Sequence, residues 1–140
     1  MDGYTLFLIF IVLLGWGGGA ILDKFATNRL GANPVIFWNV VGYAIVSVIF
    51  VLFLLKPQEL FAKDPMGVVW ALVSGVVGAI GGIAYFMLLA NKDASMVVPA
   101  TAIYPAVTAL LAFFFLKESL TPTKVIGILL ATLAVYLLSI

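Results

Sequence analysis

The chain has 140 residues and a formal net charge of +1; 65% of its residues are hydrophobic and only 9% are charged. A water-soluble domain carries roughly 25% charged residues, so these few charges cannot cover a soluble globule of this length. Cysteine and histidine do not occur, which excludes disulfides and thiolate metal sites and removes the commonest general base. The sequence also lacks the concentrated basic patch that nucleic acid requires. We therefore expect an all-α integral membrane protein that folds in the lipid bilayer.

Uncharged apolar runs divide the chain into a bundle of about five predicted transmembrane helices. A span needs about 20 apolar residues, and it must be helical because lipid offers the backbone no hydrogen-bond partners. The expected spans, all within a single domain over residues 1–140, are residues 4–22, 35–55, 66–90, 94–116 and 123–140. The last span is long enough only if it includes Thr123 and Lys124, whose side chain can reach the interface.

The basic residues between the spans do not settle the orientation in the membrane. Five spans put four lysines on the side of the N-terminus and three basic residues on the other: Lys56, Lys63, Lys117 and Lys124 against Lys24, Arg29 and Lys92. This is a weak bias for a cytoplasmic N-terminus. Such near balance is also what a chain that inserts in both orientations would show.

Small residues in the third span predict a close helix contact. Ser74, Gly78 and Gly82 form a small-xxx-small ladder, and small residues let helix backbones approach each other in lipid. The ladder serves either packing within the chain or a seam between two copies.

Three consecutive glycines, Gly17, Gly18 and Gly19, follow Trp16 near the end of the first span. Each glycine weakens a helix by roughly 1 kcal/mol relative to alanine. The run is therefore a candidate bend, or a point where a ligand meets the backbone. Trp16 is either an anchor at the headgroups or, because of these glycines, part of a site.

Pro99 and Pro105 lie in the fourth span, and each removes a backbone donor and frees the carbonyl behind it. Freed backbone groups at membrane depth are tolerated only inside protein or beside a wet cavity. Broken spans of this kind recur at transporter substrate sites. The two prolines predict either a gating element or a simple kink that improves packing.

No Asp or Glu lies near the middle of a predicted span, whereas small proton-coupled multidrug antiporters of four helices need a membrane-embedded carboxylate. No combination of nucleophile, base and metal ligand occurs either, so we expect neither an enzyme nor a metal or cofactor site. Lys24, just past the first span, can reach the interface or a cavity. The uncharged groups that could orient a substrate at span depth are Asn39, Tyr85, Thr101 and Tyr104.

These residues resemble a known family. Residues 15–17 (Gly-Trp-Gly) followed by Lys24 look like the "WG…K" signature that opens EamA domains of the drug/metabolite transporter superfamily. Residues 99–105, then residues 116–121 and Gly127, are similar to the closing stretch of that family. There a proline-broken helix is followed by "L-x-E-x-L-T" and a last helix that contains glycine. The resemblance covers nearly the whole chain.

The resemblance implies that this chain is one five-helix half of a transporter built from two inverted repeats. A single half could rebuild such a transporter only as an antiparallel homodimer, in a prokaryotic inner membrane. The cavity would lie between spans one, three and four, near five of the candidates: Trp16, Lys24, Tyr85, Thr101 and Tyr104. Many members carry an arginine where this chain has Asn39, which argues against an anionic substrate.

We therefore expect a membrane transporter that exports small organic metabolites by alternating access and works as a dimer. The alternative is a non-transporting packing subunit, or a half-transporter that needs a different partner chain.

Overall fold

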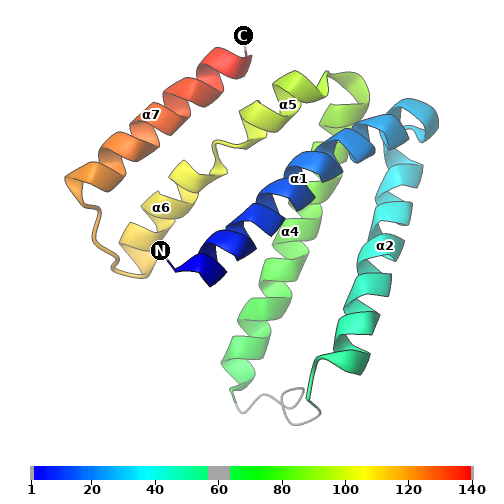
Figure 1. Ribbon diagram of the computed structural model, residues 1–140, viewed down its shortest axis with the longest axis horizontal. Coiled ribbons are helices and arrows are strands. Elements are labelled where there is room, and N and C mark those ends of the chain that lie inside the picture. Colours follow the sequence, from blue (N-terminus) through cyan, green and yellow to red (C-terminus); the bar gives the residue numbers. More distant parts are fainter. Residues whose placement is uncertain (1, 57–63, 140) are drawn as a thin grey trace. The chain divides into compact units, whose positions relative to one another are not determined.

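The computed structural model of the protein describes residues 2–56 and 64–139, and these residues form helices and no strand. In chain order the helices are α1 (Gly3–Leu30), α2 (Ala32–Phe53), α4 (Pro65–Asn91), α5 (Ala94–Thr101), α6 (Tyr104–Phe115) and α7 (Pro122–Ser139), as labelled in Figure 1. The all-α prediction is confirmed. Lys63, used above for orientation, and Ile140, the end of the expected fifth span, lie outside the described residues.

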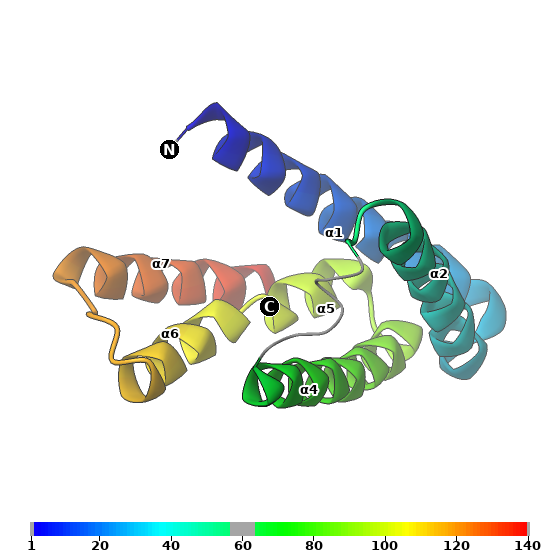
Figure 2. The same ribbon diagram turned by 90° about the horizontal axis from the view of Figure 1, so that it is seen from below.

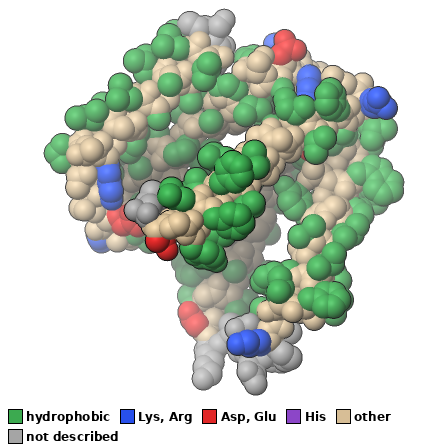
Figure 3. All heavy atoms as spheres, in the orientation of Figure 1, with side chains coloured by type: hydrophobic (Ala, Val, Ile, Leu, Met, Phe, Trp, Pro, Cys, Tyr) green, Lys and Arg blue, Asp and Glu red, His purple; other side chains and the backbone are tan. Residues whose placement is uncertain are grey.

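Lipid is the solvent for most of this apolar surface. Within the described residues, α1, α2, α4 and the segment Ala94–Phe115 are long and apolar enough to cross a membrane, and α7 is a shorter apolar helix. Most of their large hydrophobic side chains are exposed. In Figure 3 these side chains cover the visible helices along much of their length. The protein is therefore an integral, multi-pass membrane protein, as its composition predicted.

Helix α1 extends beyond the first predicted span, from Leu22 through Asp23 and Lys24 to Leu30. Neither Asp23 nor Lys24 interrupts it, because both residue types are tolerated inside helices. The chain turns at Gly31, whose backbone angles are φ 75° and ψ 175°. That region is accessible essentially to glycine alone, so Gly31 ends α1 and lets α2 begin at Ala32.

The helix α1 is not broken at Gly17, Gly18 and Gly19, because it is one continuous helix across them; a bend there stays a prediction. Their combined cost of roughly 3 kcal/mol relative to alanine does not outweigh the backbone hydrogen bonds that a break in lipid would leave unsatisfied. A gating role for these glycines stays a prediction.

The described chain divides into two compact units. Unit 1 contains α1 up to Ile21 together with residues 91–139, and unit 2 contains residues 22–90. In unit 1, α7 runs back along α5 and α6, as Figures 1 and 2 show. In unit 2, the buried residues lie near the end of α1, the start of α2 and the end of α4: Thr27, Val35, Phe86 and Leu89.

The glycine ladder of α4 meets no close neighbour among the described residues. No described atom outside its own helix backbone lies within 4 Å of a Cβ built at Gly78 or Gly82. Close packing at these two positions within the chain is therefore not seen. A role of Ser74, Gly78 and Gly82 in packing against a second copy stays a prediction.

Gly31→Ala is expected to destabilise the protein by about 1–3 kcal/mol, because alanine is strained at the backbone angles of Gly31. No described atom lies within 4 Å of the added Cβ, so the cost is conformational rather than steric. Gly42→Ala is the matched control, because Gly42 lies inside α2 with equal space around it and alanine favours helix there. Thermal unfolding in detergent should give a lower midpoint for Gly31→Ala only; an unchanged midpoint would contradict this account.

Candidate functional site

The fourth apolar run is folded as two helices rather than one. Helix α5 ends at Thr101 and α6 begins at Tyr104. Pro99 lies inside α5 and Pro105 in the first turn of α6. Because proline has no N–H, Pro105 cannot donate to the carbonyl of Thr101. This interruption lies within a segment that is otherwise long and apolar enough to cross the membrane.

The hydroxyl of Thr101 is used at the interruption itself. Its Oγ1 donates to the carbonyl oxygens of Val97, at 2.9 Å, and Val98, at 3.1 Å. Back-bonding of this kind to a preceding turn tends to bend a helix. Thr101 therefore contributes to the end of α5 in this structure. Tyr104 begins α6 with its side chain 53% exposed.

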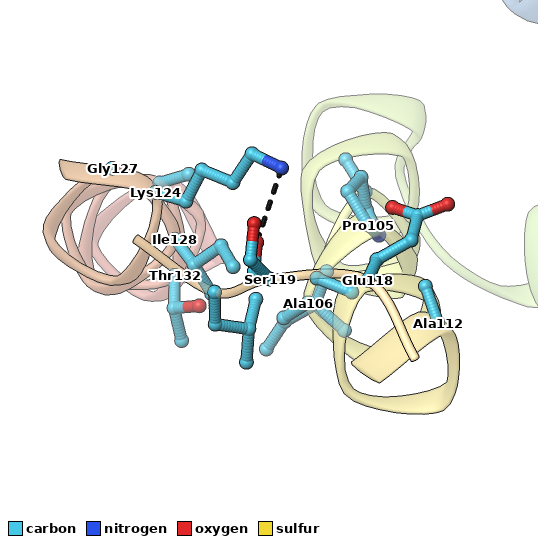
Figure 4. A pocket seen from close by; sticks show the side chains of 14 residues that line it. Pro105, Ala106, Ala112, Glu118, Ser119, Lys124, Gly127, Ile128 and Thr132 are labelled. Carbon is cyan, nitrogen blue, oxygen red and sulfur yellow. Dashed lines mark hydrogen bonds between the residues drawn. The ribbon is translucent and has the colours of Figure 1, made fainter. Parts of the chain in front are cut away.

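A cavity of about 400 Å³ lies beside the interruption, between α6 and α7 (Figure 4). Small side chains leave this space: alanines recur every three residues along one face of α6, at positions 106, 109 and 112, and Gly127 and Ala131 lie on α7. The lining residues are Ala102, Ile103, Pro105, Ala106, Ala109, Ala112, Glu118, Ser119, Leu120, Lys124, Gly127, Ile128, Ala131 and Thr132. Of the sequence-predicted site residues, Pro105 alone is among them.

The segment between α6 and α7 and the first turn of α7 bring one charge of each sign to this cavity. Lys117 has a φ of 57°, and the next amide, that of Glu118, donates to the carbonyl of Ala112 at 3.3 Å. This turn ends α6 with a residue in the left-handed region. The ammonium of Lys124 donates to the carbonyl of Ser119 at 3.3 Å, as the dashed line in Figure 4 marks. The cavity therefore has an apolar wall and a polar end that carries one carboxylate and one ammonium.

Unit 2 holds a separate polar cluster at the α1–α2 hairpin. The Nδ2 of Asn39 donates to Oδ1 of Asp23 at 3.2 Å, and both side chains are half-buried. Asp23 comes eight residues before Gly31 and Asn39 eight residues after it. The antiparallel hairpin therefore brings the two side chains to the same level.

Lys24 of α1 contacts the end of α4 within unit 2. Its Nζ donates to the carbonyl oxygen of Leu89 at 2.9 Å. Leu89 lies in the last turn of α4, where carbonyls have no partner within the helix. A cation there also interacts favourably with the helix dipole. Lys24 therefore caps α4, in addition to any contact with a ligand.

The other sequence-predicted residues are distributed over the two units. Tyr85 of α4 is half-buried, and its ring packs edge-on against Phe86 with centroids 5.7 Å apart. Trp16 lies in the part of α1 that belongs to unit 1, with its side chain 68% exposed. Unit 2 thus holds Lys24, Asn39 and Tyr85, whereas unit 1 holds Trp16, Thr101, Tyr104 and both prolines. A shared cavity for all of them stays a prediction.

Sequence reasoning missed Asp23 and the alanine wall. The first predicted span ends at residue 22 and so leaves Asp23 out, although the sequence shows that Asp23 and Asn39 are equally far from Gly31. The periodic alanines of α6 at positions 106, 109 and 112 were also visible. Thr132 gave no signal, since a lone threonine in an apolar helix is common. Across residues 2–56 and 64–139, no three His, Cys, Asp or Glu side chains gather as they would around a metal ion.

Lys24→Leu is expected to destabilise the protein by about 1–3 kcal/mol, because it leaves the carbonyl of the buried residue Leu89 without its donor. Lys24→Arg should retain most of the stability, since guanidinium can donate to the same oxygen. Arg29→Leu removes a charge at an exposed position of the same helix. Its free energy of unfolding should stay within about 0.5 kcal/mol of that of the parent. Thermal unfolding in one detergent compares the three variants; equal midpoints for Lys24→Leu and Arg29→Leu would refute the capping role.

Comparison with known proteins gives the family. The profile of the EamA-like transporter family matches residues 3–140. An uncharacterized protein of Methanocaldococcus jannaschii is 35% identical over 133 residues, which cover 93% of this chain and 92% of that protein. No solved structure matches the chain significantly. The chain therefore belongs to the EamA-like transporter family, as the motifs in its sequence predicted.

Proposed function

We propose that this member of a transporter family is one half of a membrane transporter, and that two copies together export small organic metabolites by alternating access. The observation that carries the proposal is the interrupted fourth span, α5–α6, next to a cavity of about 400 Å³. Family membership supports transport in general. The export direction and the dimer of inverted halves follow the family resemblance, the substrate class follows the lining of the cavity, and all three belong to the proposal.

The interruption supports alternating access because it divides one membrane-length segment into two short rods. Ala102 and Ile103 connect the rods, and a few such residues can absorb the backbone rotation of a hinge. In lipid, a break of this kind is tolerated where the freed backbone groups line a cavity. The carbonyl left without the proline donor belongs to Thr101, and the residues that follow it, Ala102, Ile103 and Pro105, line a cavity. Pro99 and Pro105 keep the gap from closing into a continuous helix.

The lining of the cavity favours a small molecule with an apolar body and a polar end. Its volume lies at the lower end of the roughly 300–1,000 Å³ that is typical of small-molecule sites. The alanine wall would contact the apolar part. Glu118 and Lys124 offer one charge of each sign at the other end, which suits a neutral or zwitterionic metabolite better than an anion.

Two features support a dimer of inverted halves. An odd number of spans reverses the orientation of whatever follows, so one five-span half can pair as an inverted repeat only with a copy inserted the other way up. The near balance of basic residues permits both insertions. The relative from Methanocaldococcus jannaschii aligns with a single five-span half over 92% of its own length. Its source also favours the plasma membrane of a prokaryotic cell.

The cavity is tested by filling it. Ala109→Leu is expected to lower the affinity for a transported metabolite at least about tenfold, or about 1.4 kcal/mol, because the larger side chain takes the space of the ligand. Ala44→Leu is the matched control at an exposed position of α2. The substrate is first sought by thermal-shift measurements on purified protein against neutral and zwitterionic metabolites, since a ligand of the folded form raises the unfolding midpoint. Equal binding by both variants would remove the cavity from the site.

The antiparallel dimer is tested by labelling single cysteines in this cysteine-free chain. Asn28→Cys follows the first span and Ser119→Cys the fourth, so the two lie on opposite sides of the membrane in any one copy. Both side chains are exposed. In intact cells a membrane-impermeant maleimide should label about half of each population if the chain inserts both ways, and all of it after permeabilisation.

Full labelling of one cysteine and none of the other would mean a single orientation. That result would rule out the antiparallel homodimer and favour the alternative, a half that works with a different partner chain or a subunit that does not transport.

A further inference from the structure

Asp23 is a carboxylate inside a membrane-length helix. It directly follows an uncharged stretch of 19 residues, Tyr4–Leu22, which already has about the length of the hydrocarbon core. Asp23 therefore lies near the edge of the hydrocarbon, where water can reach it from one side. Its side chain is nevertheless half-buried between helices of unit 2. An ionisable side chain in a transmembrane segment is costly and commonly marks an ion or proton pathway.

The partner of Asp23 is an amide, which can serve both protonation states of a carboxyl group. In this structure Nδ2 of Asn39 donates to Oδ1 of Asp23 at 3.2 Å. A protonated carboxyl group becomes a donor, and rotation of the Asn39 amide would then present its oxygen as the acceptor. A lysine or arginine partner has no acceptor and would hold the carboxyl group ionised.

The other titratable groups near Asp23 in unit 2 are accounted for. Lys24, the next residue of α1, directs its ammonium to the carbonyl of Leu89 in α4. Tyr85 of α4 is half-buried in the same unit. Helix α2 contributes the uncharged Asn39. Among the described groups, the carboxyl group thus has an amide partner on α2, whereas the ammonium of Lys24 is directed to a backbone carbonyl.

We propose that the Asp23–Asn39 pair binds the proton that is exchanged for substrate during transport. The step is the addition of one proton from water to a carboxylate oxygen of Asp23, and the return of that proton to water after the protein changes conformation. No other bond forms or breaks. The coupling rests on the proposed transport function, whereas proton binding by Asp23 does not.

Proton binding is tested without any substrate. Infrared difference spectra of the purified protein in lipid, recorded between mildly alkaline and mildly acidic pH, should show the C=O stretch of a protonated carboxyl group. Asp23→Asn should remove one such band. Asp93→Asn, the same change at an exposed carboxylate without a side-chain cap bond, should retain the Asp23 band. Asn39→Leu should shift the pH midpoint of this band. A spectrum that is the same for Asp23→Asn and Asp93→Asn overturns the site.

Coupling is tested in proteoliposomes with the metabolite that gives the largest thermal shift. An imposed pH gradient should drive its accumulation by the parent and by Asp93→Asn. Asp23→Asn should lose gradient-driven accumulation but retain counterflow of the same metabolite within about twofold of the parent. If the parent shows counterflow but the pH gradient drives no accumulation, the coupling is overturned and the transport function is retained. Absence of any counterflow by the parent overturns both, and the infrared band still decides whether Asp23 binds a proton.

Discussion

The structure depends on one constraint, that backbone N–H and C=O groups in lipid must find partners within the protein. This constraint makes each apolar run helical even where β-branched residues are frequent. It also explains why the three glycines of α1 produce no break, whereas α5 and α6 are separated: glycine keeps its N–H, and proline has none. The position of the interruption is thus a matter of backbone chemistry and not of helix propensity.

The same constraint explains why two polar side chains donate to backbone carbonyls. Thr101 donates to two carbonyls at the end of α5, and Lys24 donates to a carbonyl in the last turn of α4. The carbonyl bonded by Lys24 lies where a helix leaves backbone acceptors without partners, whereas Thr101 adds a donor to the carbonyl of Val98, which also accepts from the amide of Ala102. A side chain with this structural use can still contact a ligand, but its substitution changes the fold as well as the function. Asn39 differs, because its partner is the side chain of Asp23 and not the backbone.

The class of the fold could be predicted from the sequence because the lengths of apolar runs report directly on the thickness of a bilayer. The end of α1 could not be predicted from charge, because Asp23 and Lys24 are compatible with helix, and the turn instead depends on the backbone angles of Gly31. The cavity could not be predicted for a related reason. It is the space beside small side chains, and alanines in an apolar helix do not by themselves indicate a cavity. The pairing of Asp23 with Asn39 required the hairpin register, which follows only once Gly31 is known to be the turn.

Helix α1 has a further consequence through its length. Its 28 residues rise about 42 Å, compared with about 30 Å for the hydrocarbon core. An excess of this size is accommodated by leaning of the helix or by thickening of the surrounding lipid. The depth of the α1–α2 turn, and with it the polarity around Asp23, therefore varies with acyl-chain length and sterol or isoprenoid content. The surroundings of this carboxyl group therefore depend on the host membrane. A thicker bilayer places it closer to the hydrocarbon core, and a thinner bilayer places it closer to the interfacial water.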